Sequence, residues 1–165
     1  MPRSVVIIAH NIRSAHNVGS ILRTAAGLGI DHVYLTGYSP FPLNKEDTRL
    51  PHLAKKIDKQ IDKTALGAAR QVPWSSGPDI GIILSKLKND RYLLAALENS
   101  VSATDLRKYK APKKLALILG SEVEGVDQQL LDAASVHLKI AMAKKNQSFN
   151  VSVAAAIAMF YLTQF

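Results

Sequence analysis

The sequence contains no cysteine and no long hydrophobic run. Without cysteine, neither a disulfide framework nor a zinc site built on thiolates can form. The most apolar stretch, Val151 to Leu162, is well short of the roughly 20 residues that span a bilayer, and it reads as a buried helix. A secretory segment with a basic start and an apolar core is not visible either. These features predict a protein of the reducing cytoplasm with no membrane partner.

Acidic residues are scarce compared with basic ones. Asp and Glu number 13 against 21 Lys and Arg, which gives a net charge of +8 and a sequence pI near 9.8. Such a surplus suits a polyanionic partner through phosphate neutralisation. Nucleic acid is the first candidate and an anionic membrane the second, while a merely solvated basic surface is the alternative.

The length of 165 residues and the 47% hydrophobic composition fit a single domain over residues 1–165. Short apolar runs of strand length alternate with helical spacing, which predicts an α/β fold with a parallel, Rossmann-like sheet. The predicted strands are Val5–Ala9, His32–Thr36, Tyr92–Leu97, Leu115–Leu119 and Val136–Ala141. The predicted helices are Asn17–Leu28, Thr64–Arg70, Pro78–Lys88, Asp127–Ala134 and Val151–Thr163.

Residues 38–63 interrupt this alternation with prolines and many charges, and we interpret them as a flexible, basic insertion. Within it, Leu53, Ile57 and Ile61 recur every four residues and could form a short amphipathic helix. The insertion is the part of the chain best suited to select an RNA.

Three polar segments follow predicted strands: His10–Arg23, Gly120–Val126 and Ala141–Asn150. Because ligands of parallel sheets bind beyond the carboxyl ends of the strands, we expect these segments to converge at one edge. The chain has no G-x-G-x-x-G after a strand, no P-loop and no H-E-x-x-H. Dehydrogenase, kinase and metallohydrolase functions therefore lose support, and no metal is expected.

The same segments carry a family resemblance. NIRSAHNVGSILRTAAGLGIDHVYLTG, LALILGSEVEGVDQQLLDAA and QSFNVSVAAAIAMFYL resemble the three successive motifs of the SpoU/TrmH branch of SPOUT methyltransferases, in the same order and spacing. KTALGAARQVPW resembles a further segment of compact members, so the resemblance extends from Val5 to Leu162. It implies a fold whose C-terminal part, about residues 92–165, forms a deep trefoil knot.

The resemblance also implies S-adenosylmethionine as methyl donor and a ribose 2′-hydroxyl of tRNA or rRNA as acceptor. In such proteins the main chain of the second and third motifs encloses the donor. The corresponding positions in this chain are Leu97, Leu119, Gly120, Ile140, Ser148 and Phe149. Independently of the family, Gly120 would let backbone groups approach a ligand closely, although a plain turn would also explain it.

Five further positions correspond to the family's reactive residues. Asn17 and Arg23 occupy the places beside the donor methyl and the target ribose, Glu122 the acidic place of the second motif, and Ser148 and Asn150 the polar pair of the third. Capping or ordinary surface roles are the alternatives for each. The family assigns the Arg23 position as proton acceptor, but a guanidinium resists deprotonation, so a phosphate and ribose clamp is the other possibility.

The chain departs from the family where Ala141 replaces a frequent proline and Lys144 stands near a frequent glycine, so the loop before Ser148 is less pre-shaped. Further phosphate contacts are expected from a group of basic residues, unless these merely form a solvated face. They are Lys144, Lys145, Arg49, Lys55, Lys56, Lys59 and Lys63.

Such methyltransferases usually act as homodimers in which the last helix packs near the partner's first motif, and the apolar run Val153 to Leu162 is compatible with this arrangement. One rival hypothesis is a non-catalytic RNA-binding or assembly factor that kept the fold. Another is a transferase that methylates a base. The intact set of reactive residues argues against the first, and the resemblance of the Asn17 to Arg23 motif to that of the family favours ribose over base.

Overall fold

The computed structural model describes residues 3–77, 79–144 and 148–164. The described strands form one sheet in the order β3-β2-β1-β6-β4-β7-β5, and every pairing between them is parallel. Their bounds are β1 Ser4–His10, β2 His32–Thr36, β3 Trp74–Gly77, β4 Leu93–Leu97, β5 Thr104–Asp105, β6 Lys114–Leu119 and β7 Val136–Lys139. The α/β fold with a parallel sheet is confirmed.

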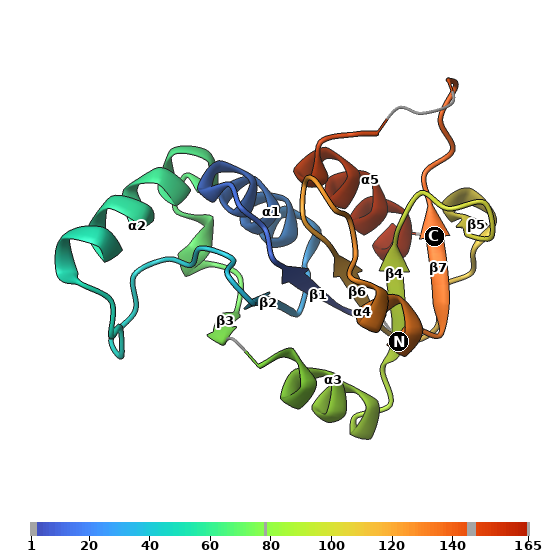
Figure 1. The fold of residues 1–165 in the computed structure, drawn as a ribbon, viewed down its shortest axis with the longest axis horizontal. Coiled ribbons are helices and arrows are strands. Elements are labelled where there is room, and N and C mark those ends of the chain that lie inside the picture. Colours follow the sequence, from blue (N-terminus) through green and yellow to red (C-terminus); the bar gives the residue numbers. More distant parts are fainter. Residues whose placement is uncertain (1–2, 78, 145–147, 165) are drawn as a thin grey trace.

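Helices cover both faces of this sheet (Figure 1). Helices α1 (Ala15–Leu28) and α5 (Val151–Gln164) pack on one face, around a core that includes Ile7, Leu22 and Met159. Helices α3 (Ile80–Asn89) and α4 (Gln128–Ala133) cover the other face, around Ile8, Leu87 and Leu130. Strands β1 and β6 are almost wholly buried because both of their faces are covered.

Helix α1 has a clear start and stop signal in the sequence. The Ser14 side chain accepts a hydrogen bond from the backbone N–H of Asn17, and Gly29 ends the helix in the left-handed conformation at φ 67°. Asn17 is therefore not the capping residue, which leaves its side chain available for contacts beyond the helix.

The insertion is ordered where the sequence suggested flexibility. Residues Pro51–Ala65 form helix α2, which packs along α1 and buries Ala54, Ile61 and Ala65. The preceding loop is held by Arg49, which hydrogen-bonds Asp47 and the carbonyl of Phe41 at 3.0 Å and stacks on the Phe41 ring. The Arg49 guanidinium is therefore engaged within the loop, and its expected phosphate contact stays a prediction.

Several other boundaries differ from the sequence prediction. Thr64 lies inside α2 and does not begin a helix, and only a short 3₁₀ turn, Ala68–Arg70, follows α2. A second 3₁₀ turn, Leu106–Lys108, follows β5. Trp74–Gly77 is an edge strand, in a stretch between two expected helices where no strand was predicted. Helix α3 begins at Ile80, and Asp79 is its N-cap. The start expected at Pro78 lies outside the described residues. In the described part of the chain, no helix is long and apolar enough to cross a bilayer.

Candidate functional site

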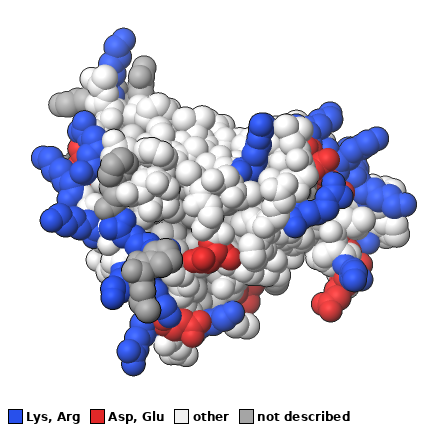
Figure 2. Space-filling view, turned by 180° about the vertical axis from the view of Figure 1, so that it is seen from behind, with Lys and Arg blue, Asp and Glu red and all other residues white. Residues whose placement is uncertain are grey.

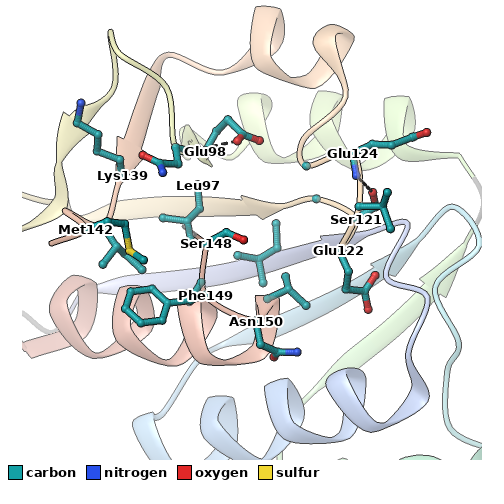
Figure 3. A pocket seen from close by; sticks show the side chains of 18 residues that line it. Leu97, Glu98, Ser121, Glu122, Glu124, Lys139, Met142, Ser148, Phe149 and Asn150 are labelled. Carbon is teal, nitrogen blue, oxygen red and sulfur yellow. Dashed lines mark hydrogen bonds between the residues drawn. The ribbon is translucent and has the colours of Figure 1, made fainter. Parts of the chain in front are cut away.

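A pocket of about 450 Å³ lies beyond the carboxyl ends of β4, β6 and β7 (Figure 3). These strands are neighbours in the sheet, so the segments that follow them meet although they are far apart in sequence. The volume falls in the range of small-molecule sites. All six positions expected to hold a donor line this pocket: Leu97, Leu119, Gly120, Ile140, Ser148 and Phe149.

The two ends of the pocket differ in chemistry. Met142 and Phe149 lie toward one end, and Glu122 and Asn150 lie toward the other, beside α1 (Figure 3). Phe149 is 42% exposed, so the apolar end remains accessible. An apolar end and a polar end suit a ligand with a flat heterocycle and a polar, reactive part.

The segment after β6 is a tight loop whose closure depends on Gly120. The backbone N–H of Ser121 donates to the carbonyl of Gly125 at 2.9 Å, and the Gly125 N–H donates back to Ser121 at 3.1 Å. A Cβ at position 120 would lie 2.1 Å from the Gly125 carbonyl oxygen. Any side chain there would therefore push the loop into the pocket or out of shape.

The Glu98 side chain holds this loop in place, a role that the sequence did not indicate. Its two carboxylate oxygens accept from the backbone N–H groups of Asn99 at 3.0 Å and Val126 at 2.9 Å. Gly125, at φ 74°, is the close neighbour, since a Cβ there would lie 2.4 Å from Glu98. A single glutamate after a strand carries no sequence signal of this role. Lys139 braces the same region by donating to the carbonyls of Ser100 and Val101.

Glu122 joins the second motif to the first. Its Oε2 accepts from the backbone N–H of Arg13 at 2.9 Å, and its Oε1 accepts from the Ser14 N–H at 3.1 Å. The same Oε1 accepts from Asn17 Nδ2 at 2.8 Å. Three donors thus fix one carboxylate at the amino end of α1, where negative charge is also favoured.

These contacts determine the charge of Glu122. Partial burial alone would raise its pKa, but the hydrogen bonds from Arg13, Asn17 and Ser14 outweigh burial and hold the pKa below the ordinary value of 4.5. A group with a depressed pKa stabilises the folded state above its unfolded value and loses that contribution as the pH falls through its folded value. Glu122 is therefore charged at neutral pH, and its hydrogen bonds connect the second motif to the first.

Asn17 and Asn150 continue the same network. Asn150 Nδ2 donates to Asn17 Oδ1 at 3.2 Å, while Asn150 Oδ1 accepts from the Ser152 backbone N–H at 2.9 Å. Asn150 therefore caps α5 and contacts the first motif at once. The hydrogen bonds among Glu122, Asn17 and Asn150 therefore connect all three polar segments at the polar end of the pocket.

His10, the last residue of β1, makes a second connection between segments at the carboxyl ends of the strands. Its Nδ1 lies 2.8 Å from Thr36 Oγ1 and its Nε2 lies 3.2 Å from Asp127. Burial lowers the pKa of His10 from its usual value of 6.5, more than Asp127 raises it. Neither at His10 nor elsewhere among the described residues do three His, Asp or Glu side chains lie close enough together to hold a metal ion.

Of the five expected reactive residues, Glu122, Ser148 and Asn150 line the pocket, Asn17 borders it through its hydrogen bonds to Glu122 and Asn150, and Arg23 does neither. It is exposed on α1, nearly two turns beyond Asn17, and it does not line the pocket. Among the described residues it makes no side-chain hydrogen bond or ion pair. Lys144 is likewise exposed after β7, while Lys145 lies outside the described residues.

Comparisons with known proteins agree with this geometry. The model of the SpoU rRNA Methylase family matches residues 4–160. A TrmH family tRNA/rRNA methyltransferase of Staphylococcus aureus is 31% identical over 157 residues, which are 95% of this chain but 57% of the relative. The chain therefore spans little more than half the length of such curated relatives.

Solved structures share the fold. The SpoU methyltransferase AviRb from Streptomyces viridochromogenes, in complex with AdoMet, superposes with a TM-score of 0.83 at 18% identity, covering 99% of this chain and 58% of that one. An RNA 2′-O ribose methyltransferase superposes with a TM-score of 0.79 at 21% identity, covering 98% and 56%. At such identities the likeness concerns the fold.

Proposed function

This chain belongs to the SpoU rRNA methylase family, and we propose that it transfers a methyl group from S-adenosylmethionine to a ribose 2′-hydroxyl of tRNA or rRNA. The observation that carries the proposal is the pocket at the joined ends of β4, β6 and β7, bordered by the Glu122–Asn17–Asn150 network. The family match and the 2′-O ribose methyltransferase among the similar structures support the same reaction.

The pocket residues fit the proposed donor. Leu97, Leu119 and Ile140 offer apolar walls for an adenine ring, and Gly120 lets the loop after β6 close tightly at the edge of the pocket. Ser148 and Phe149 would complete the enclosure. When bound, S-adenosylmethionine supplies an electrophilic methyl group on a sulfonium sulfur.

The protein's task in this reaction is mainly orientation. Attack on a methyl group requires the acceptor oxygen in line and water excluded, with no covalent intermediate on the protein. Asn17, held by Glu122 and Asn150, presents its amide at the polar end of the pocket, where the acceptor ribose would lie. Ser148 supplies a hydroxyl to the lining of the pocket.

We assign Arg23 to clamping the phosphate and ribose of the RNA. A guanidinium stays protonated at neutral pH, so it binds anions well and accepts protons poorly. The hydroxyl proton would then leave to water or to a substrate phosphate.

We further propose a homodimer, in which Arg23, absent from the lining of its own pocket, serves the site of the partner. In the proposed dimer, α5 of one chain packs near α1 of the other, and the partner's arginine reaches the pocket. Val153 and Phe160, which are 45% and 46% exposed on α5, supply apolar surface for such an interface. Further parts of the proposal are one domain with a trefoil knot over about residues 92–165, and action in the cytoplasm.

The test is transfer of label from radiolabelled S-adenosylmethionine to purified ribosomal and small RNA. We expect label in fragments that resist alkali, because a 2′-O-methyl group blocks cleavage of the adjacent phosphodiester. Donor binding without transfer to any RNA would instead favour a non-catalytic RNA-binding or assembly factor. Gly120→Val, which should lose donor binding through the displaced loop, serves as the inactive control.

A further inference from the structure

The exposed face of α2 carries a row of lysines that the proposed reaction does not use. Lys55, Lys56, Lys59 and Lys63, here called the lysine stripe, are all exposed. At 3.6 residues per turn their spacing places them within an arc of about 100°, opposite the buried Ile61. From the first to the last, the stripe extends about 12 Å along the helix.

The stripe is not neutralised within the protein. Among the described residues, none of its four ammonium groups makes a hydrogen bond or ion pair. The acidic residues of the same helix are turned elsewhere: Asp58 accepts from the Leu43 N–H at 2.8 Å and Asp62 from the Gly67 N–H at 2.9 Å. Lys55, Lys59 and Lys63 also follow one another at four-residue intervals, where like charges destabilise a helix. Such a face costs stability unless it has an anionic partner.

The helix holds the stripe in a fixed place beside the candidate site. Thr64, next to Lys63, donates from its hydroxyl to the His16 carbonyl at 2.8 Å, one residue before Asn17. Gly19 permits this close approach, because a Cβ there would lie 2.2 Å from both the Ile61 carbonyl and the Thr64 hydroxyl. The stripe thus begins at the amino end of α1 and leads away from the pocket.

Figure 2 shows the charge around this helix on the molecular surface. Lysine and arginine side chains gather at both ends of the molecule, and the right-hand group in this view lies over α2. Between the two groups the surface is largely uncharged. On this face the basic side chains are therefore concentrated at the two ends, and acidic side chains stand among them at the right-hand end.

We propose that the lysine stripe of α2 binds the phosphate backbone of the RNA that flanks the target nucleotide. This inference rests on the proposed function, since it assumes RNA at the adjacent pocket. Lysine binds phosphate as a point charge and needs no base contact, so the stripe would add affinity without reading sequence. A membrane is the less suitable partner, because an interfacial helix inserts its apolar face and that of α2 is packed on α1.

The test compares two variants of equal charge in the full-length protein. The stripe variant carries Lys55→Gln, Lys56→Gln, Lys59→Gln and Lys63→Gln. The control carries Lys86→Gln, Lys88→Gln, Lys110→Gln and Lys113→Gln, whose side chains are exposed on α3 or in the segment before β6. Binding to a fluorescein-labelled RNA stem–loop is measured over a range of salt concentrations, together with binding of S-adenosylmethionine and thermal unfolding.

We expect the stripe variant to lose roughly 100-fold in RNA affinity near physiological salt and its salt slope to fall by about 3, as four lost phosphate contacts require. Donor binding should be unchanged, thermal stability should not fall because the removed charges repel one another, and the control should lose far less affinity. Equal losses in both variants would overturn the inference. So would unchanged RNA binding accompanied by lost binding to phosphatidylglycerol vesicles, which would indicate a membrane partner. Stripe-dependent RNA binding without methyl transfer by the wild type would uphold the stripe while refuting the proposed reaction.

Discussion

At the scale of single residues, the structure separates two readings of Asn17. Its place at the start of a helix favours an N-cap, but Ser14 takes that role. The Asn17 amide instead bridges Glu122 and Asn150, which come from two distant segments. The motif spacing pointed to a site at these residues, whereas only coordinates could show which groups hydrogen-bond. The contribution of Glu98 could not be foreseen, because it depends on the backbone N–H of Val126 in a folded loop.

Arg23 provides the sharpest test at this scale. Arg23→Ala should abolish methyl transfer, because the proposed clamp on the phosphate and ribose of the RNA would be lost. Binding of S-adenosylmethionine should stay close to that of the wild type, because Arg23 does not line the pocket. Isothermal titration with the donor and a transfer assay measure the two quantities separately.

Lys88→Ala is the matched control, since it removes an exposed charge from α3 on the opposite face of the sheet. Full activity of Arg23→Ala would refute the role carried over from the family.

At the scale of secondary structure, elements with strong local signals were predicted well. The strand His32–Thr36 has the predicted bounds, and α1 ends at Gly29 as expected. The edge strand β3 was missed because its sequence, WSSG, has little apolar content, and it forms by pairing with β2. Helix α2 was underestimated because its charges and the prolines at and before its start resemble a loop, whereas its stability comes from packing on α1.

The contact between α1 and α2 gives a prediction at this scale. In Gly19→Ala the new methyl group would meet the backbone of Ile61, and such overpacking costs about 1–3 kcal/mol. The better helix propensity of alanine offsets only about 1 kcal/mol. We therefore expect a lower free energy of unfolding in urea, together with weaker RNA binding as α2 is displaced.

Gly27→Ala is the control in the same helix. A Cβ at Gly27 meets no atom within 4 Å, so this variant should be more stable than the wild type by up to about 1 kcal/mol. If Gly19→Ala were equally stabilised, the close packing of the two helices would be wrong.

At the scale of the whole molecule, the account depends on a second copy of the chain. The pocket is assembled within one chain, and Arg23 does not line it. In the proposed homodimer, the partner would supply this residue. The sequence could not reveal this separation, because residues six apart on one helix say nothing about which chain's pocket they serve.

Mixing two inactive variants tests this arrangement. Arg23→Ala lacks the clamp and Gly120→Val lacks the donor pocket, so each homodimer should be inactive. In a heterodimer, the pocket of the Arg23→Ala chain would receive the intact arginine of its partner, so one of the two sites would be complete. We expect co-expressed, doubly tagged heterodimers to recover transfer activity. An inactive heterodimer would mean that Arg23 serves its own chain.

The most direct test of the central claim is the chemical identity of the product. RNA methylated by the purified protein would be digested to nucleosides and analysed by mass spectrometry. The account predicts a nucleoside whose added mass remains on the ribose fragment, and predicts its absence with Gly120→Val. A methyl group on the base fragment would contradict the ribose assignment of the site.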